Sequence, residues 1–234
     1  MRATLALTTM IHSIIAIHGF GVKPADAWRS EDADGNKTVN WLNYETMLPT
    51  VCPKCRILAF GYDSVPIGET PARQSIQAMA ENLLRGLVAK RKNCERRPIV
   101  FVGHCLGGLI AQKAYTIAMV HAQDFPHIYD SATGFLSLET PYEGLSAENG
   151  LCRMFEQIAR PQMRSETNLI DGLTRDNDGL VSVVHEFTRE VSKRTAPPEV
   201  FCFFEQRLTR FGDIAGVETE LVCGITSLLC NNSN

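Results

Sequence analysis

The sequence predicts an α/β fold in which a mostly parallel β-sheet is flanked by helices. Short apolar runs rich in β-branched residues alternate with longer segments whose apolar residues recur every three or four positions. This alternation is typical of parallel strands that are connected by helices. The chain has 234 residues, of which 44% are hydrophobic, and this is enough for one substantial core. We therefore expect one domain over residues 1–234.

Each predicted strand is a short apolar run that ends at a turn. The first run ends at His18-Gly19-Phe20-Gly21, and the second ends at Gly61-Tyr62-Asp63. The predicted strands are residues 14–17, 56–60, 98–102, 134–138, 199–205 and 220–224.

Helices are predicted between these strands. A helix over residues 72–92 is indicated by one apolar face, and the run 109–121 predicts a second helix behind a glycine turn. Residues 145–195 have a mixed helical pattern that is broken at Pro161, and they predict a helical cap inserted into the domain. The apolar face of the first helix consists of Ile76, Met79, Ala80, Leu83, Leu84, Leu87 and Val88.

Composition argues against several functional classes. Lys and Arg number 23 against 26 Asp and Glu, so the chain lacks the basic surface that nucleic acid requires. No apolar run approaches the roughly 18 to 20 residues of a membrane span. The pair Cys52 and Cys55 has no second pair to complete a zinc site, and we interpret it as two thiols on a turn. We expect no metal, no cofactor and a cytoplasmic protein, whose oligomeric state stays open.

The most specific motif is Gly103-His104-Cys105-Leu106-Gly107-Gly108, which lies between a predicted strand and a predicted helix. This order is typical of a nucleophile elbow, a sharp turn that presents one side chain at the mouth of a site. That side chain is Cys105, and the N–H groups of the following helix would favour its thiolate. In the alternative interpretation, Cys105 is a buried thiol and the glycines serve only close packing.

The loop His18-Gly19-Phe20-Gly21 predicts a second part of the same site. In a site with a nucleophile elbow, two backbone N–H groups bind the oxyanion that forms on attack. One comes from the loop after an early strand, and the other comes from the residue that follows the nucleophile. The expected donors are therefore the backbone N–H groups of Phe20 and Leu106.

Together these residues resemble the lipase-like α/β-hydrolase domains found in fungal proteins and in the eukaryotic "serine active site containing" family. Order and spacing agree over nearly the whole chain. The resemblance implies an α/β-hydrolase fold that acts on acyl esters. The matching stretches are Ile15-Ala16-Ile17-His18-Gly19-Phe20-Gly21, Trp28, Trp41, Met47-Leu48-Pro49, Arg56-Ile57-Leu58-Ala59-Phe60-Gly61-Tyr62-Asp63, Val102-Gly103-His104-Cys105-Leu106-Gly107-Gly108-Leu109-Ile110, Thr140-Pro141-Tyr142-Glu143-Gly144 and Phe201-Cys202-Phe203-Phe204-Glu205.

Three departures from the family pattern concern the chemistry. The family has serine at the position of Cys105. It also has glycine at the position of Glu139, at the start of a segment that continues Thr140-Pro141 in both. The family places its catalytic histidine after the last strand, and no histidine follows His185 in this sequence.

The remaining candidates for base and acid are few. His18 and His104 flank the site in sequence, and we expect them to support loops. His185 is the candidate that the predicted cap would hold over the site. Glu205 ends a predicted strand where this fold carries its acid, although it could equally form a surface ion pair with an arginine.

The sequence thus predicts an acyl-transfer enzyme, either an esterase or thioesterase-type hydrolase or an acyltransferase, with Cys105 as a low-pKa nucleophile and Glu205 in a supporting role. Its substrate would be a small-molecule or carrier-bound acyl ester or thioester. Two alternatives stay open: a catalytically silent domain used for binding or signalling, and a truncated form whose parent carries the histidine.

Overall fold

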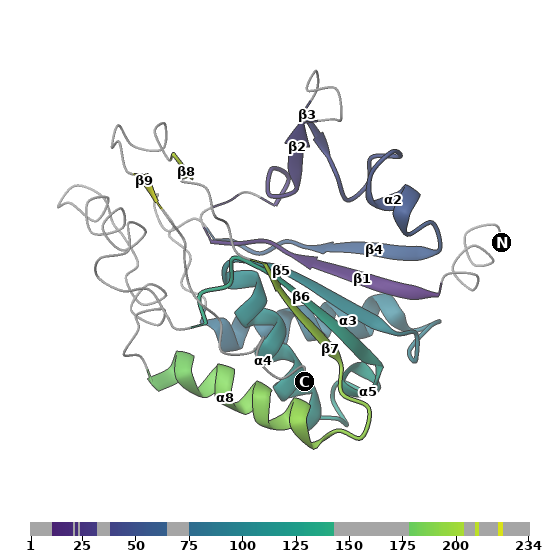
Figure 1. Ribbon diagram of the computed structural model, residues 1–234. Helices are drawn as coiled ribbons and strands as arrows, with labels where there is room; N and C mark the ends of the chain where they lie inside the picture. The colour runs from purple at the N-terminus through teal and green to yellow at the C-terminus, as the bar shows by residue number, and fades with distance from the viewer. Residues whose placement is uncertain are drawn as a thin grey trace.

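The computed structural model describes residues 11–20, 22, 24–31, 38–64, 75–142, 178–203, 209–210 and 220–221. Its centre is a sheet of five parallel strands in the order β4-β1-β5-β6-β7 (Figure 1). The predicted parallel sheet is therefore confirmed. The strands are β1 (His12–Ile17), β4 (Cys55–Phe60), β5 (Ile99–His104), β6 (Ala132–Leu138) and β7 (Glu199–Phe203).

The long helices pack against one face of this sheet (Figure 1). Alternate strand residues such as Ile15, Phe101 and Phe135 point into this layer and form the main core with the apolar helix faces. Ser75 caps the first of these helices by accepting a hydrogen bond from the backbone N–H of Ala78. The helices are α3 (Ile76–Arg91), α4 (Leu106–Val120), α5 (Ile128–Ser131) and α8 (Asp178–Lys193).

A smaller layer covers part of the other face (Figure 1). It contains the antiparallel pair β2 (Arg29–Glu31) and β3 (Thr38–Asn40) and the short helix α2 (Leu48–Val51). Trp28 and Leu42 from this layer pack with Ile14, Ala16 and Val102 in a second core cluster. The helices of the described residues thus flank the sheet unequally.

Two segments differ from the sequence-based expectation. Helix α8, the last part of the predicted cap, packs beside α4 through Phe187, whose ring contacts Tyr115 and Phe135 at 5.5 and 4.8 Å between centroids. It therefore belongs to the layer on the sheet, while residues 143–177 lie outside the described part of the chain.

The predicted last strand of the central sheet is wrong. Residues 220–221 form β9 (Glu220–Leu221), which pairs antiparallel with β8 (Thr209–Arg210) in a separate two-stranded sheet.

Among the described helices, none is both long enough and apolar enough to cross a membrane.

Candidate active site

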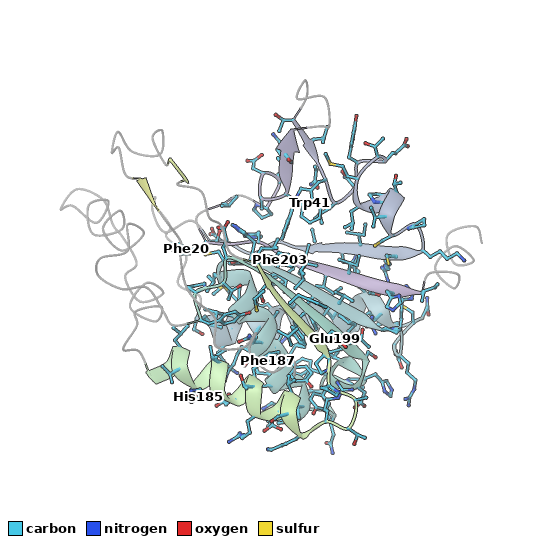
Figure 2. All side chains as sticks on the ribbon, viewed as in Figure 1. Phe20, Trp41, His185, Phe187, Glu199 and Phe203 are labelled. Carbon is cyan, nitrogen blue, oxygen red and sulfur yellow. The ribbon has the colours of Figure 1, made fainter. Side chains whose placement is uncertain are left out.

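The candidate site lies at the carboxyl ends of β1, β4, β5 and β6. Because the strands are parallel, the residues that follow them meet at one edge of the sheet. These residues are the Gly19-Phe20 loop after β1, Tyr62 after β4, Cys105 after β5 and Glu139 after β6. Figure 2 shows Phe20 at this edge.

Cys105 occupies the strained turn that the sequence predicts. Its backbone has φ 50° and ψ −121°, which side chains other than glycine rarely adopt. Gly107 makes this turn possible, because a Cβ atom there would lie 2.1 Å from the carbonyl oxygen of Ile17 in β1. The start of α4 can therefore approach β1 closely and hold Cys105 beside the Gly19-Phe20 loop.

The surroundings of Cys105 raise the pKa of its thiol. Burial is the largest cause, and the negative charge of Glu139 adds to it. Backbone N–H groups of Leu106 and Phe20 donate hydrogen bonds to the sulfur and act in the opposite direction. The expectation of a low-pKa thiol is therefore wrong, since desolvation outweighs the two N–H groups. At neutral pH Cys105 is a protonated thiol.

His18 fixes the loop that carries Phe20. It is fully buried, its Nδ1 lies 2.8 Å from the carbonyl oxygen of Gly19, and its Nε2 accepts a hydrogen bond from the backbone N–H of Tyr62. The Tyr62 ring stacks on His18 at 4.1 Å, and its hydroxyl donates to the His18 carbonyl oxygen at 2.8 Å. Burial lowers the pKa of His18, so the imidazole is neutral and supports the loop, as the sequence predicts.

Tyr62 is a site residue that sequence reasoning did not single out. It is buried next to Cys105, and burial followed by the charge of Cys105 raises the pKa of its phenol. The available signal was its position in Gly61-Tyr62-Asp63, directly after the strand next to β1.

His104 and Glu139 lie close to each other beside Cys105. His104 Nε2 lies 3.6 Å from a carboxylate oxygen of Glu139. A Cβ atom added to Gly19 would lie 2.8 Å from His104 Nδ1 and 3.0 Å from Cys105 Cβ, so both side chains border the same space. Glu139 has φ 54°, and its backbone N–H donates to the Phe203 carbonyl oxygen at 2.9 Å.

Of the remaining candidates, the described structure places His185, and it lies away from Cys105. His185 is exposed on the side of α8 that faces away from the sheet, whereas Phe187 points toward the sheet (Figure 2). The expectation that His185 hangs over the site is therefore wrong. Glu205 lies outside the described residues. Within the described part of the chain, no cluster of three or more metal-ligating side chains is found.

The chain is similar to known proteins in sequence and in fold. A family model described as "Putative serine esterase (DUF676)" matches residues 60–194, which include the elbow. Protein SERAC1 of Bos taurus is 28% identical over 148 residues, a match that covers 56% of this chain and 22% of that protein. The chain thus spans about a fifth of the length of this relative.

The solved structures that are similar to this chain include Phospholipase PlaB from Legionella pneumophila. It matches with a TM-score of 0.57 and 13% identity, over 86% of this chain and 39% of that chain. The same phospholipase in complex with thio-NAD gives a TM-score of 0.52 at 12% identity, over 82% of this chain and 37% of that one. At such identities the likeness shows the fold alone, and the chain has the α/β-hydrolase fold. Because the family model spans more than half of the chain, this protein belongs to the family described as "Putative serine esterase (DUF676)".

Proposed function

We propose that this protein is an acyl-transfer enzyme in which Cys105 takes the place of the esterase serine. Membership in the serine esterase family supports an esterase-type hydrolase. The observation that carries the cysteine assignment is the strained backbone of Cys105, whose sulfur receives hydrogen bonds from Phe20 and Leu106. A side chain held in a strained conformation between two convergent N–H donors is typical of a nucleophile in acyl transfer.

The proposed reaction has two halves. In the first, the thiol loses its proton, Cys105 Sγ forms a bond to the acyl carbonyl carbon, and the negative charge on the carbonyl oxygen is stabilised by the N–H groups of Phe20 and Leu106. The C–O or C–S bond of the substrate then breaks, and the leaving alcohol or thiol takes up a proton. In the second half, water, an amine or another thiol attacks the acyl group and releases Cys105.

Thioesters are the substrate class that fits a cysteine nucleophile best, because attack by sulfur on a thioester exchanges one C–S bond for another. Small-molecule and carrier-bound acyl groups are both compatible with this chemistry. Glu205 keeps its proposed supporting role as the acid of the site. The proposed location is the cytoplasm, since the five cysteines of the described residues are free thiols.

Acyl transfer to Cys105 is tested by incubating the protein with S-phenyl thioacetate and p-nitrophenyl acetate over a range of pH. Intact-mass and peptide mass spectrometry then locate the acetyl group. We expect one acetyl adduct on Cys105, because the oxyanion donors stabilise the transition state at this thiol. Cys105→Ala should lose the adduct, and Cys94→Ala, which removes a free thiol elsewhere, should retain it.

A folded protein that forms no Cys105 adduct at any pH contradicts the proposal. That result would identify the chain as a catalytically silent hydrolase-fold domain used for binding. The raised pKa of the Cys105 thiol is the observation that favours this second candidate.

A further inference from the structure

The raised pKa of Cys105 creates a requirement that the proposed function leaves open. A thiol that is protonated at neutral pH must transfer its proton to a base before or during attack. No histidine follows His185 in this sequence. We therefore ask which described residue at the site itself can serve as the base.

All six histidines of the chain lie in the described residues, and five of them are unsuitable. His18 has both ring nitrogens in backbone hydrogen bonds. His12 begins β1, at the end of the strand away from the site, and His185 faces outward on α8. The remaining two lie beyond α4, where His121 ends the helix 4.0 Å from Asp124 and His127 lies 3.8 Å from Glu95.

His104 is the histidine whose ring borders the same space as Cys105. A Cβ atom on Gly19 would enter this space and would lie 2.8 Å from His104 Nδ1 and 3.0 Å from Cys105 Cβ. The ring's other nitrogen, Nε2, faces Glu139 at 3.6 Å. A carboxylate at Nε2 favours the tautomer with the proton on that nitrogen, which leaves a lone pair on Nδ1, the ring nitrogen that borders the shared space.

The backbone of Glu139 supports a role for its carboxylate. Three described residues other than glycine have positive φ, and two of them, Cys105 and Glu139, follow neighbouring strands at this site. Such a conformation is strained and persists only in fixed surroundings. Here the backbone hydrogen bond from Glu139 to Phe203 holds the turn and directs the carboxylate toward His104.

We propose that His104 is the general base for Cys105 and that Glu139 is the positioning residue that orients and stabilises its ring. This inference rests on the proposed function, because it supplies the base for the same nucleophile. It replaces a distant histidine with the residue that directly precedes the nucleophile.

His104 takes up and returns one proton in each half of the proposed reaction. The Sγ–H bond of Cys105 breaks, the proton moves to His104 Nδ1, and the sulfur attacks the acyl carbon. The imidazolium then lies between two negative groups, the thiolate or oxyanion and Glu139, which stabilises its charge. His104 returns the proton to the leaving alcohol or thiol. For deacylation the ring takes a proton from water or the acceptor amine and gives it to the departing Cys105 sulfur.

The test measures the single-turnover rate of Cys105 acetylation by S-phenyl thioacetate against pH. Besides Cys105 and Glu139, the titratable groups of the described residues that face His104 or Cys105 are His18 and Tyr62, and both are unchanged in every variant. We expect His104→Ala to lower the rate at neutral pH by about 100-fold. The rates of wild type and His104→Ala should become equal at high pH, where hydroxide ionises the thiol without help from a protein base. Imidazole in the buffer should restore part of the lost rate.

Two further variants complete the experiment. Glu139→Gln preserves the shape of the side chain and removes its charge, so the rate should fall by about tenfold and the acidic limb of the profile should move to lower pH. His121→Ala, which removes an exposed histidine beyond α4, should behave as wild type. If His104→Ala fails to fold, His104→Gln takes its place, because the shift in Glu139→Gln alone would also follow from the effect of the Glu139 charge on the Cys105 thiol.

The outcomes separate this inference from the proposed function. Acetylation of wild-type Cys105 with unchanged profiles in His104→Ala and Glu139→Gln overturns the role of the pair and leaves the acyl-transfer function standing. No acetylation of wild-type Cys105 overturns both. A loss in His104→Ala that is equal at all pH values and insensitive to imidazole shows a purely structural role and overturns the inference.

Discussion

At the scale of single residues, the site combines two histidines with opposite tasks. His18 is neutral and locked, because the Gly19 carbonyl and the Tyr62 N–H occupy its two ring nitrogens. His104 has one nitrogen facing Glu139 and the other toward the space beside Cys105. Burial lowers the pKa of His18 and keeps it neutral, whereas the proposed task of His104, beside Glu139, is to accept a proton.

The locked state of His18 predicts a pH-dependent stability. Burial lowers its pKa in the folded protein, so between that value and about 6.5 the unfolded chain binds a proton that the folded chain does not. The stability contributed by His18 is therefore present above about pH 6.5 and is lost as pH falls. His18→Asn removes the hydrogen bond with the Tyr62 N–H and should lower the free energy of unfolding near neutrality by about 1 to 3 kcal/mol.

Urea denaturation at about pH 7.5 and about pH 5 measures this prediction. The difference in free energy of unfolding between wild type and His18→Asn should be smaller at the lower pH, because the variant lacks the group whose pKa differs between the folded and unfolded states. A difference that is the same at both values would mean that His18 titrates equally in the folded and unfolded states.

At the scale of secondary-structure elements, close contact between β1 and α4 builds the elbow. Gly107 lies against the last residue of β1, and Gly103 lies against the first turn of α4, where a Cβ atom would be 2.4 Å from the Gly108 nitrogen. Both obstacles are backbone atoms, which cannot move aside as a flexible side chain could. The two glycines therefore set the distance between the strand and the helix that hold Cys105.

Gly107→Ala should destabilise the protein by about 3 kcal/mol, since the added Cβ would lie 2.1 Å from the Ile17 carbonyl oxygen. The matched control is Gly86→Ala in α3, where a Cβ meets nothing within 4 Å. That change should stabilise by about 0.5 to 1 kcal/mol, because alanine is the better helix former. Thermal denaturation compares both variants, and equal effects would contradict the proposed contact.

At the scale of the whole molecule, α8 closes the main core. Phe187 contacts Tyr115 of α4 and Phe135 of β6, and the Arg194 guanidinium just after the helix donates to the carbonyl oxygens of Tyr129 and Ala132 at 3.1 Å. These contacts connect residues that are more than 50 positions apart in sequence. Because α8 is held by these contacts, it is part of the helical layer on the sheet and contributes to the stability of the fold.

Phe187→Ala should lower the free energy of unfolding by about 3 to 5 kcal/mol, as expected for a fully buried aromatic residue. His185→Ala, on the outer side of the same helix, should change it by less than about 0.5 kcal/mol and leave Cys105 acetylation unaffected. Urea denaturation and the acetylation assay measure these two effects. A small loss in Phe187→Ala would indicate that α8 is a detachable cap.

Local sequence patterns determined the strands, α3, α4 and the elbow. Apolar periodicity and glycine turns act over a few residues, so the positions of β1, β4, β5, β6 and β7 could be predicted to within about two residues. The elbow follows from Gly103 and Gly107 around Cys105, because only this spacing permits the turn. The two-stranded pairing of residues 220–221 was missed, since a short apolar run does not specify its partner strand.

Only the tertiary structure decided the environment of Cys105. The sequence places a helix N-terminus after the thiol, which favours ionisation, but the burial that raises the pKa of Cys105 depends on which loops close around it. The meeting of His104 with Glu139 requires the pairing of β5 with β6, 35 positions apart. The outward orientation of His185 follows from the face by which α8 packs on α4. Desolvation and electrostatic interactions act through space, so local sequence alone determined the turn, whereas the assembled fold decided its chemistry.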